Sequence, residues 1–168
     1  PKKQDSDLLC VYPMGDPHVG LFTWAEQTGE DFDLEKAEAY LVSSVDMLVD
    51  LAPPAENALI IDLGDFFHTD NIRNATMRNK HSLYVAGMWA EILGVGIRIV
   101  RRLIDRALEK HKHVTVIIEI GNHDDHSAVM LALCLHAYFH KDPRVTIDTS
   151  SDQFHWYRFG ETLIGVTH

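Results

Sequence analysis

The chain has 168 residues, with 15 Lys and Arg against 25 Asp and Glu, which gives a formal net charge of −10 at pH 7. It also carries 11 histidines. The length is typical of a single domain, and the acidic balance argues against broad coating of nucleic acid. No apolar run approaches the roughly 20 residues that span a bilayer, and two cysteines do not make a disulfide framework. We therefore expect a cytoplasmic protein that does not bind membranes.

The first half of the chain predicts a strand, a helix and a second strand. Apolar runs at 8–12 and 58–63 indicate buried strands, and a polar stretch over 64–80 shows no helical period. Between the two strands, Asp33 is expected to cap a helix that stops before Pro53. The apolar stripe of this helix comprises Leu34, Ala37, Tyr40, Leu41, Val45 and Leu48.

The second half begins with the same alternation and then becomes rich in strands. Residues 82–110 and 127–140 have helical periodicity, and 114–120 is an apolar run typical of a buried strand. Three short strands follow, at 144–147, 154–159 and 162–167. This order predicts one α/β domain over 1–168, with a largely parallel sheet and covering helices.

Polar clusters directly follow four of these strands. The clusters contain Asp16 and His18, then Asp65 and His68, then Asn122, His123 and Asp124, and finally His168. Because the carboxyl ends of strands in an open α/β sheet meet at one crevice, we expect these side chains to converge. Carboxylate, amide and imidazole ligands suit Mn²⁺, Fe, Zn²⁺ or Co, and such a set can hold two ions that act on phosphate.

The clusters resemble motifs of the calcineurin-like metallophosphoesterase superfamily, in the form found in bacteria and phages. The matching segments are Asp16-x-His18, Gly64-Asp65-x-x-His68, Gly121-Asn122-His123-Asp124 and Gly165-Val166-Thr167-His168. The resemblance implies a metallophosphoesterase-type α/β/β/α sandwich, with mixed sheets covered by helices. The Gly-His-x-His loop that ends the family's pattern is absent from the sequence. We therefore expect a fragment of a longer protein, truncated at its C-terminus.

The resemblance also implies two divalent metal ions, with Mn first in order and Fe, Zn, Ni or Co as alternatives. In family terms, Asp16 and His18 would hold the first ion, Asp65 would bridge both, and Asn122 and His168 would hold the second.

His123 would act as the general acid that protonates the leaving oxygen, and Asp124 would accept a hydrogen bond from its imidazole. Outside the metal ligands, His68 either touches substrate or caps the next segment. Arg73 and Arg78 lie in the loop after Asp65, where they could contact a substrate phosphate.

The expected function is hydrolysis of a phosphoester by a metal-activated hydroxide. We favour a phosphodiester substrate, such as DNA or a nucleotide, which would make the protein a nuclease or phosphodiesterase. One alternative is a phosphomonoesterase or protein phosphatase of the same family. The other is a non-catalytic scaffold that keeps the fold as a binding surface. The sequence leaves the oligomeric state open.

Overall fold

One parallel sheet organises the molecule. The computed structural model describes residues 4–76, 79–150 and 152–168. Its four-stranded sheet has the order β1-β2-β3-β4, and every neighbouring pair is parallel. The strands are β1 (Asp5–Met14), β2 (Ala55–Asp62), β3 (His113–Ile118) and β4 (Val145–Ile147). The sequence therefore predicted the α/β class and the parallel pairing correctly.

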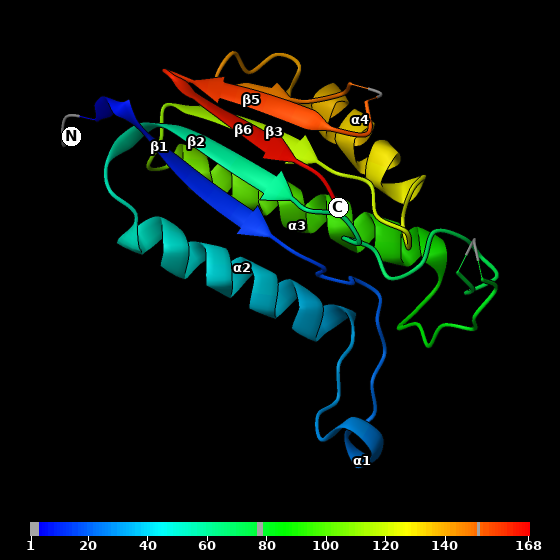
Figure 1. The fold of residues 1–168 in the computed structure, drawn as a ribbon. Coiled ribbons are helices and arrows are strands. Elements are labelled where there is room, and N and C mark those ends of the chain that lie inside the picture. Colours follow the sequence, from blue (N-terminus) through cyan, green and yellow to red (C-terminus); the bar gives the residue numbers. More distant parts are fainter. Residues whose placement is uncertain (1–3, 77–78, 151) are drawn as a thin grey trace.

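Three helices cover one face of this sheet (Figure 1). They are α2 (Leu34–Leu51), α3 (Trp89–Leu108) and α4 (Ser127–Phe139), and each joins two consecutive strands. The larger core lies between these helices and alternate residues of the strands, such as Tyr12, Ile60 and Val116. A short helix, α1 (Ala25–Thr28), lies in the connection that leads from β1 to α2.

A hairpin covers the other face of the sheet. It consists of β5 (His155–Phe159) and β6 (Thr162–Val166), which pair antiparallel and form a separate sheet. Val166 packs in a second apolar cluster with Leu59, Ile61 and Ile117. The expectation of mixed sheets is therefore wrong for the described residues, because the parallel and antiparallel strands belong to different sheets.

The register of the sheet brings three strand ends to one edge. Met14 at the end of β1 lies opposite Asp62 at the end of β2, and Asp62 lies opposite Ile118 at the end of β3. The loops that follow these strands therefore leave the sheet side by side, and the chain ends beside them at His168 (Figure 1).

The sequence predicts the start of α2 correctly but places the start of α3 too early. The Asp33 side chain accepts a hydrogen bond from the Lys36 N–H at 2.9 Å, so the expected cap of α2 is confirmed. The helix expected over 82–110 begins only at Trp89. Its first residues instead form isolated β-bridges, which join Ser82 to Ala75 and Val85 to Leu21.

None of the helices in the described ranges combines the length and hydropathy needed to cross a membrane. This is consistent with the sequence, in which we found no such apolar run.

Candidate metal centre

The loops after β1 and β2 are paired through their main chains. The His18 N–H donates to the Asp65 carbonyl at 3.1 Å, and the Val19 N–H donates to the Phe66 carbonyl at 2.7 Å. The His68 N–H donates back to the Val19 carbonyl at 3.0 Å. These bonds fix the two loops to each other just beyond the edge of the sheet, so residues from separate motifs become neighbours.

Three site residues have a left-handed main chain. The φ angles are 48° at Asp16, 46° at His18 and 53° at Asp65. Positive φ is uncommon outside glycine, although Asp and His tolerate it better than most residues. Such conformations persist only where surrounding contacts enforce them, and here the paired loops supply those contacts.

Gly121 allows the loop after β3 to approach Asp65. A Cβ atom at position 121 would lie 2.0 Å from Asp65 Oδ1 and 2.2 Å from the Asp65 nitrogen. No side chain fits at these distances, so the Gly-Asn-His-Asp segment depends on its glycine for this contact. Beyond the glycine, the His123 N–H donates to Asp65 Oδ1 at 2.8 Å.

Asp65 lies at the centre of the site, with only 4% of its surface exposed. While Oδ1 accepts from the His123 main chain, Oδ2 lies 4.0 Å from His18 Nε2 and 3.8 Å from His168 Nε2. These two separations are too long for hydrogen bonds. Separations of this size suit a cation placed between the carboxylate oxygen and an imidazole nitrogen.

His168 is oriented for such a role. Its Nδ1 lies 2.8 Å from the Leu63 carbonyl, so Nδ1 carries the proton and the neutral ring keeps an electron pair on Nε2, toward Asp65. Imidazoles that bind metals commonly donate their second N–H to a carbonyl in this way. Asp16, Asp65 and His168 each offer one ligand atom, and these atoms lie within 4.8 Å of one another.

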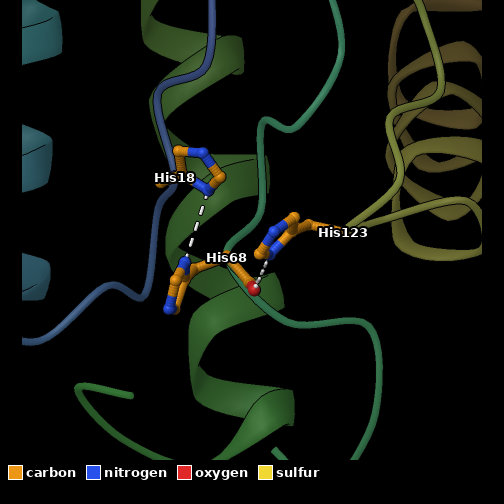
Figure 2. Close-up of side chains that lie close together, drawn as sticks. All are labelled: His18, His68 and His123. Atoms are coloured by element: carbon orange, nitrogen blue, oxygen red, sulfur yellow. Dashed lines mark hydrogen bonds between the residues drawn. The ribbon is translucent and has the colours of Figure 1, made fainter. Parts of the chain in front are cut away.

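A second group consists of three histidines, His18, His68 and His123 (Figure 2). Their ligand atoms also lie within 4.8 Å of one another. The Nδ1 atoms of His18 and His68 are 3.3 Å apart, and His123 Nδ1 lies 2.8 Å from the His68 carbonyl. From the sequence alone, the role of His68 stayed open between substrate contact and capping of the next segment. The sequence signal that pointed to this position was its place in Gly64-Asp65-x-x-His68, three residues after Asp65.

The surroundings favour neutral imidazoles in this group. Burial lowers the pKa of His68 to about 4, and the neighbouring His18 and His123 act in the same direction. Burial also lowers the pKa of His18, reinforced by His123 and partly opposed by Asp65 and Asp16. Since only the neutral ring binds a metal, both side chains are in the binding form at neutral pH.

The structure corrects the expected role of Asp124. Its Oδ2 accepts from the Phe67 N–H at 2.9 Å and its Oδ1 accepts from the Gly121 N–H at 3.0 Å. The imidazole of His123 is instead oriented by the His68 carbonyl. Asp124 is fully buried, and burial raises its pKa to about 6. It therefore ties the loops after β2 and β3 together and does not orient the imidazole of His123.

Asn122 and His168 line one cavity of about 550 Å³ between the loop after β3 and the hairpin. Glu119, Asp125 and Phe154 also line it. The two residues expected at the second ion therefore lie on the same cavity, although they come from different strand ends.

Of the two arginines expected to contact substrate, Arg73 does not join this arrangement. Arg73 is exposed in the loop and does not line the cavity beside Asn122. Arg78 lies outside the described residues, so this expectation is not tested.

A third group with metal-ligand spacing, formed by Asp70, Asp125 and His126, stabilises the fold. The buried carboxylate of Asp70 accepts main-chain N–H bonds from His126 at 3.0 Å and Ser127 at 2.6 Å, at the start of α4. The His126 Nδ1 also lies 2.8 Å from Asp70 Oδ2. Asp125 completes a group with metal-ligand spacing, but the oxygens of Asp70 are already used for capping the helix.

The donor set fits divalent cations. The two groups offer carboxylate oxygen and neutral imidazole nitrogen, and Asp65 and His18 lie at their boundary. This division differs from the expected one, because His18 groups with His68 and His123 while Asp16 groups with Asp65 and His168. Residues from the loops after β1, β2 and β3 and from the segment after β6 thus lie together at this edge.

Comparisons of the chain with models of protein families, with curated proteins and with solved structures found no match. The site's chemistry must therefore be argued from its own geometry.

Proposed function

We propose that the protein is a metal-dependent hydrolase of phosphodiesters, of the calcineurin-like metallophosphoesterase type. The supporting observation is the position of Asp65 Oδ2, which lies within 4.0 Å of ring nitrogens of His18 and His168. A central carboxylate between two imidazoles can bridge a pair of cations in a two-metal hydrolytic site. The fold supports the same proposal, because a helix layer, a parallel sheet and a hairpin are three layers of the expected α/β/β/α sandwich.

Asp16, His18, Asp65 and His168 would hold the ions, with Asn122 on the adjoining cavity. Bound divalent ions neutralise phosphate oxygens and lower the pKa of water, so that a nucleophile forms near neutral pH. The described lining of the cavity beside Asn122 contains no Lys or Arg. The negative charge of a substrate in that cavity would therefore have to be neutralised by the ions.

The chain's own contribution to proton transfer would come from His123. Its Nδ1 is held by the His68 carbonyl at 2.8 Å, which fixes the ring and leaves the other nitrogen, Nε2, for proton transfer. A proton on Nε2 can pass to the leaving oxygen, which restores the neutral ring. The same nitrogen could instead bind a metal, so the two roles of His123 must be separated by experiment.

The decisive experiment measures metal content and hydrolysis together. Protein stripped by a chelator and reloaded with Mn²⁺ should hydrolyse bis(4-nitrophenyl) phosphate, and Asp65→Asn should lose metal and at least about 10²-fold in turnover. Asp105→Asn, an exposed carboxylate on α3, is the matched control and should keep both. Full metal content in Asp65→Asn would overturn the bridging role. Turnover of 4-nitrophenyl phosphate without any diester cleavage would replace the proposal by a phosphomonoesterase.

A further inference from the structure

A second cavity adjoins the histidine group on the side away from the hairpin. Its volume is about 530 Å³, and residues from 21–28 and from 82–84 form its walls. His68 also lines it. Because His68 belongs to the group with His18 and His123, this cavity and the candidate metal centre share a side chain.

Three aromatic side chains line this cavity while exposing much of their surface. The exposed fractions are 44% for Phe22, 50% for Trp24 and 78% for Tyr84. Exposed aromatic residues scattered over a surface need no explanation. Three that meet at one concave site next to a reactive centre form a stacking surface for a planar ligand.

The main chain holds the walls in place. The Phe22 N–H donates to the Tyr84 carbonyl at 3.1 Å, and Leu21 forms an antiparallel bridge with Val85. A second antiparallel bridge joins Thr23 to Phe32. The aromatic side chains therefore project from braced segments, which lowers the entropy that a ligand must overcome on binding.

The lining selects a neutral ligand with polar edges. The described lining residues include no Asp, Glu, Lys or Arg, so a phosphate or a carboxylate would find no opposite charge there. Polar side chains of Gln27 and Ser82 line the same cavity and offer hydrogen bonds, while the hydroxyls of Thr23 and Thr28, which already donate to main-chain carbonyls, can still accept. A planar aromatic body with donors and acceptors at its edge matches this combination, and a nucleobase has that chemistry.

We propose that this cavity binds the nucleobase of a nucleotide substrate whose phosphodiester lies at the candidate metal centre. The inference deepens the proposed function and rests on it for the placement of the phosphate. The base would stack on Trp24 and Tyr84, and His68 would mark the boundary between the base and the phosphate. The cavity beside Asn122 is the competing location, since Phe154 lines it, but it also carries the acids Glu119 and Asp125.

The test begins with adenosine, which has a base but no phosphate, so that binding needs neither metal nor turnover. Calorimetry on metal-stripped protein should detect adenosine, and Trp24→Ala and Tyr84→Ala should each weaken its affinity by about 5-fold or more. Phe154→Ala in the other cavity and Trp156→Ala on the exposed face of β5 are matched controls and should leave it unchanged. Since Trp24 and Tyr84 are both well exposed, replacing them should not disturb the core, and circular dichroism would confirm that the variants fold.

A substrate pair then links the cavity to the reaction. Thymidine 5′-(4-nitrophenyl) phosphate and methyl 4-nitrophenyl phosphate share the leaving group and differ in the base. The KM of the thymidine ester should be at least about 5-fold lower, and Trp24→Ala should remove this difference while leaving the methyl ester unaffected.

The possible outcomes separate the two proposals. Diester hydrolysis without adenosine binding, or adenosine binding that depends on Phe154, would overturn the nucleobase site and leave the hydrolase standing. Adenosine binding that depends on Trp24, without hydrolysis of any ester, would support the base site and overturn the proposed reaction.

Discussion

The main-chain N–H of His123 donates to Oδ1 of Asp65 at 2.8 Å, which leaves Oδ2 of the same carboxylate toward His18 and His168. One oxygen is therefore committed to positioning the loop after β3, and the other faces the candidate ligands. Under the proposed function, Asp65 would couple the placement of His123 to the placement of a cation. Substitutions that move the loop after β2 or the loop after β3 should therefore alter both metal binding and proton transfer.

Replacing Gly121 by Ala tests this coupling directly. The added Cβ would lie 2.0 Å from Asp65 Oδ1, so the carboxylate or the loop must shift. We expect the affinity for Mn²⁺ to fall by about tenfold or more and the free energy of unfolding to fall by about 1–3 kcal/mol. Metal titration and urea unfolding measure the two effects.

Gly94→Ala is the matched control for that substitution. Gly94 is exposed within α3, and its Cβ would meet no atom within 4 Å. Since alanine favours helix over glycine by about 1 kcal/mol, this variant should be as stable as the wild type or more so, with unchanged metal affinity. Equal behaviour of the two variants would show that the contact at Gly121 is unimportant.

Variants of His123 and His68 should separate proton donation from metal binding. His123→Ala is expected to lower turnover of an aryl phosphodiester by about 10²-fold or more while both ions stay bound. His68→Ala, which removes a ring buried within the histidine group, is expected to reduce metal content. Elemental analysis beside the rate assay distinguishes these cases. Loss of metal from His123→Ala would assign that ring to coordination.

Asp124→Asn should destabilise the loops after β2 and β3 without changing proton transfer by His123. Both oxygens of the Asp124 carboxylate accept main-chain N–H bonds, and an amide can replace only one of them. We expect the free energy of unfolding to fall by about 1–3 kcal/mol, because a buried N–H loses its partner.

The pH profile of turnover distinguishes the two possible roles of Asp124. Because the imidazole of His123 contacts the His68 carbonyl, the pH at which turnover falls on the alkaline side should be the same in Asp124→Asn as in the wild type. A fall of turnover at lower pH in the variant would restore the role that the sequence suggested, since an adjacent carboxylate stabilises a charged ring.

Asp62 should make the protein less stable as the pH rises. Its carboxyl group is fully buried, and neither oxygen makes a hydrogen bond within the described residues. Burial raises its pKa well above the usual value, and the charge of Asp124 adds to the shift. The folded state therefore holds a proton that the unfolded chain releases near pH 4, so the free energy of unfolding falls as the pH rises from about 4 to the folded pKa.

Asp62→Asn removes this titration. In metal-free buffer, the stability of the wild type relative to this variant should drop between pH 4 and pH 8, as measured by urea unfolding. Asp105→Asn serves again as the control and should run parallel to the wild type. Parallel curves for Asp62→Asn would mean that Asp62 is ionised and compensated in the folded protein.

Local sequence patterns were sufficient to predict the sheet and the convergence of the site. The apolar runs at 8–12, 58–63 and 114–120 all lie within or overlap parallel strands, and Met14, Asp62 and the end of β3 share one register. Once the strands are parallel, residues that follow them must meet at one edge. This geometric rule is why distant motifs could be grouped correctly.

Contacts between distant segments account for what could not be predicted. The stripe of α2 included Tyr40 and Leu48, yet both are exposed, and the Tyr40 hydroxyl donates to Glu30 at 2.6 Å. Residues before Trp89 fit a helical period but bridge to other loops. The partners of Asp124 are main-chain groups whose positions depend on the tertiary structure. Periodicity carries no information about such contacts.

Three carboxylates join the loops after β2 and β3 in alternating directions: Asp65 accepts from the His123 N–H, Asp124 from the Phe67 N–H, and Asp70 from the Ser127 N–H. Each of these two loops thus depends on bonds from the other for its arrangement. For protein engineering, the loops after β2 and β3 would have to be transferred together, along with the loop after β1 that pairs with the first of them, because grafting one motif singly onto another parallel sheet would transfer its residues without their arrangement.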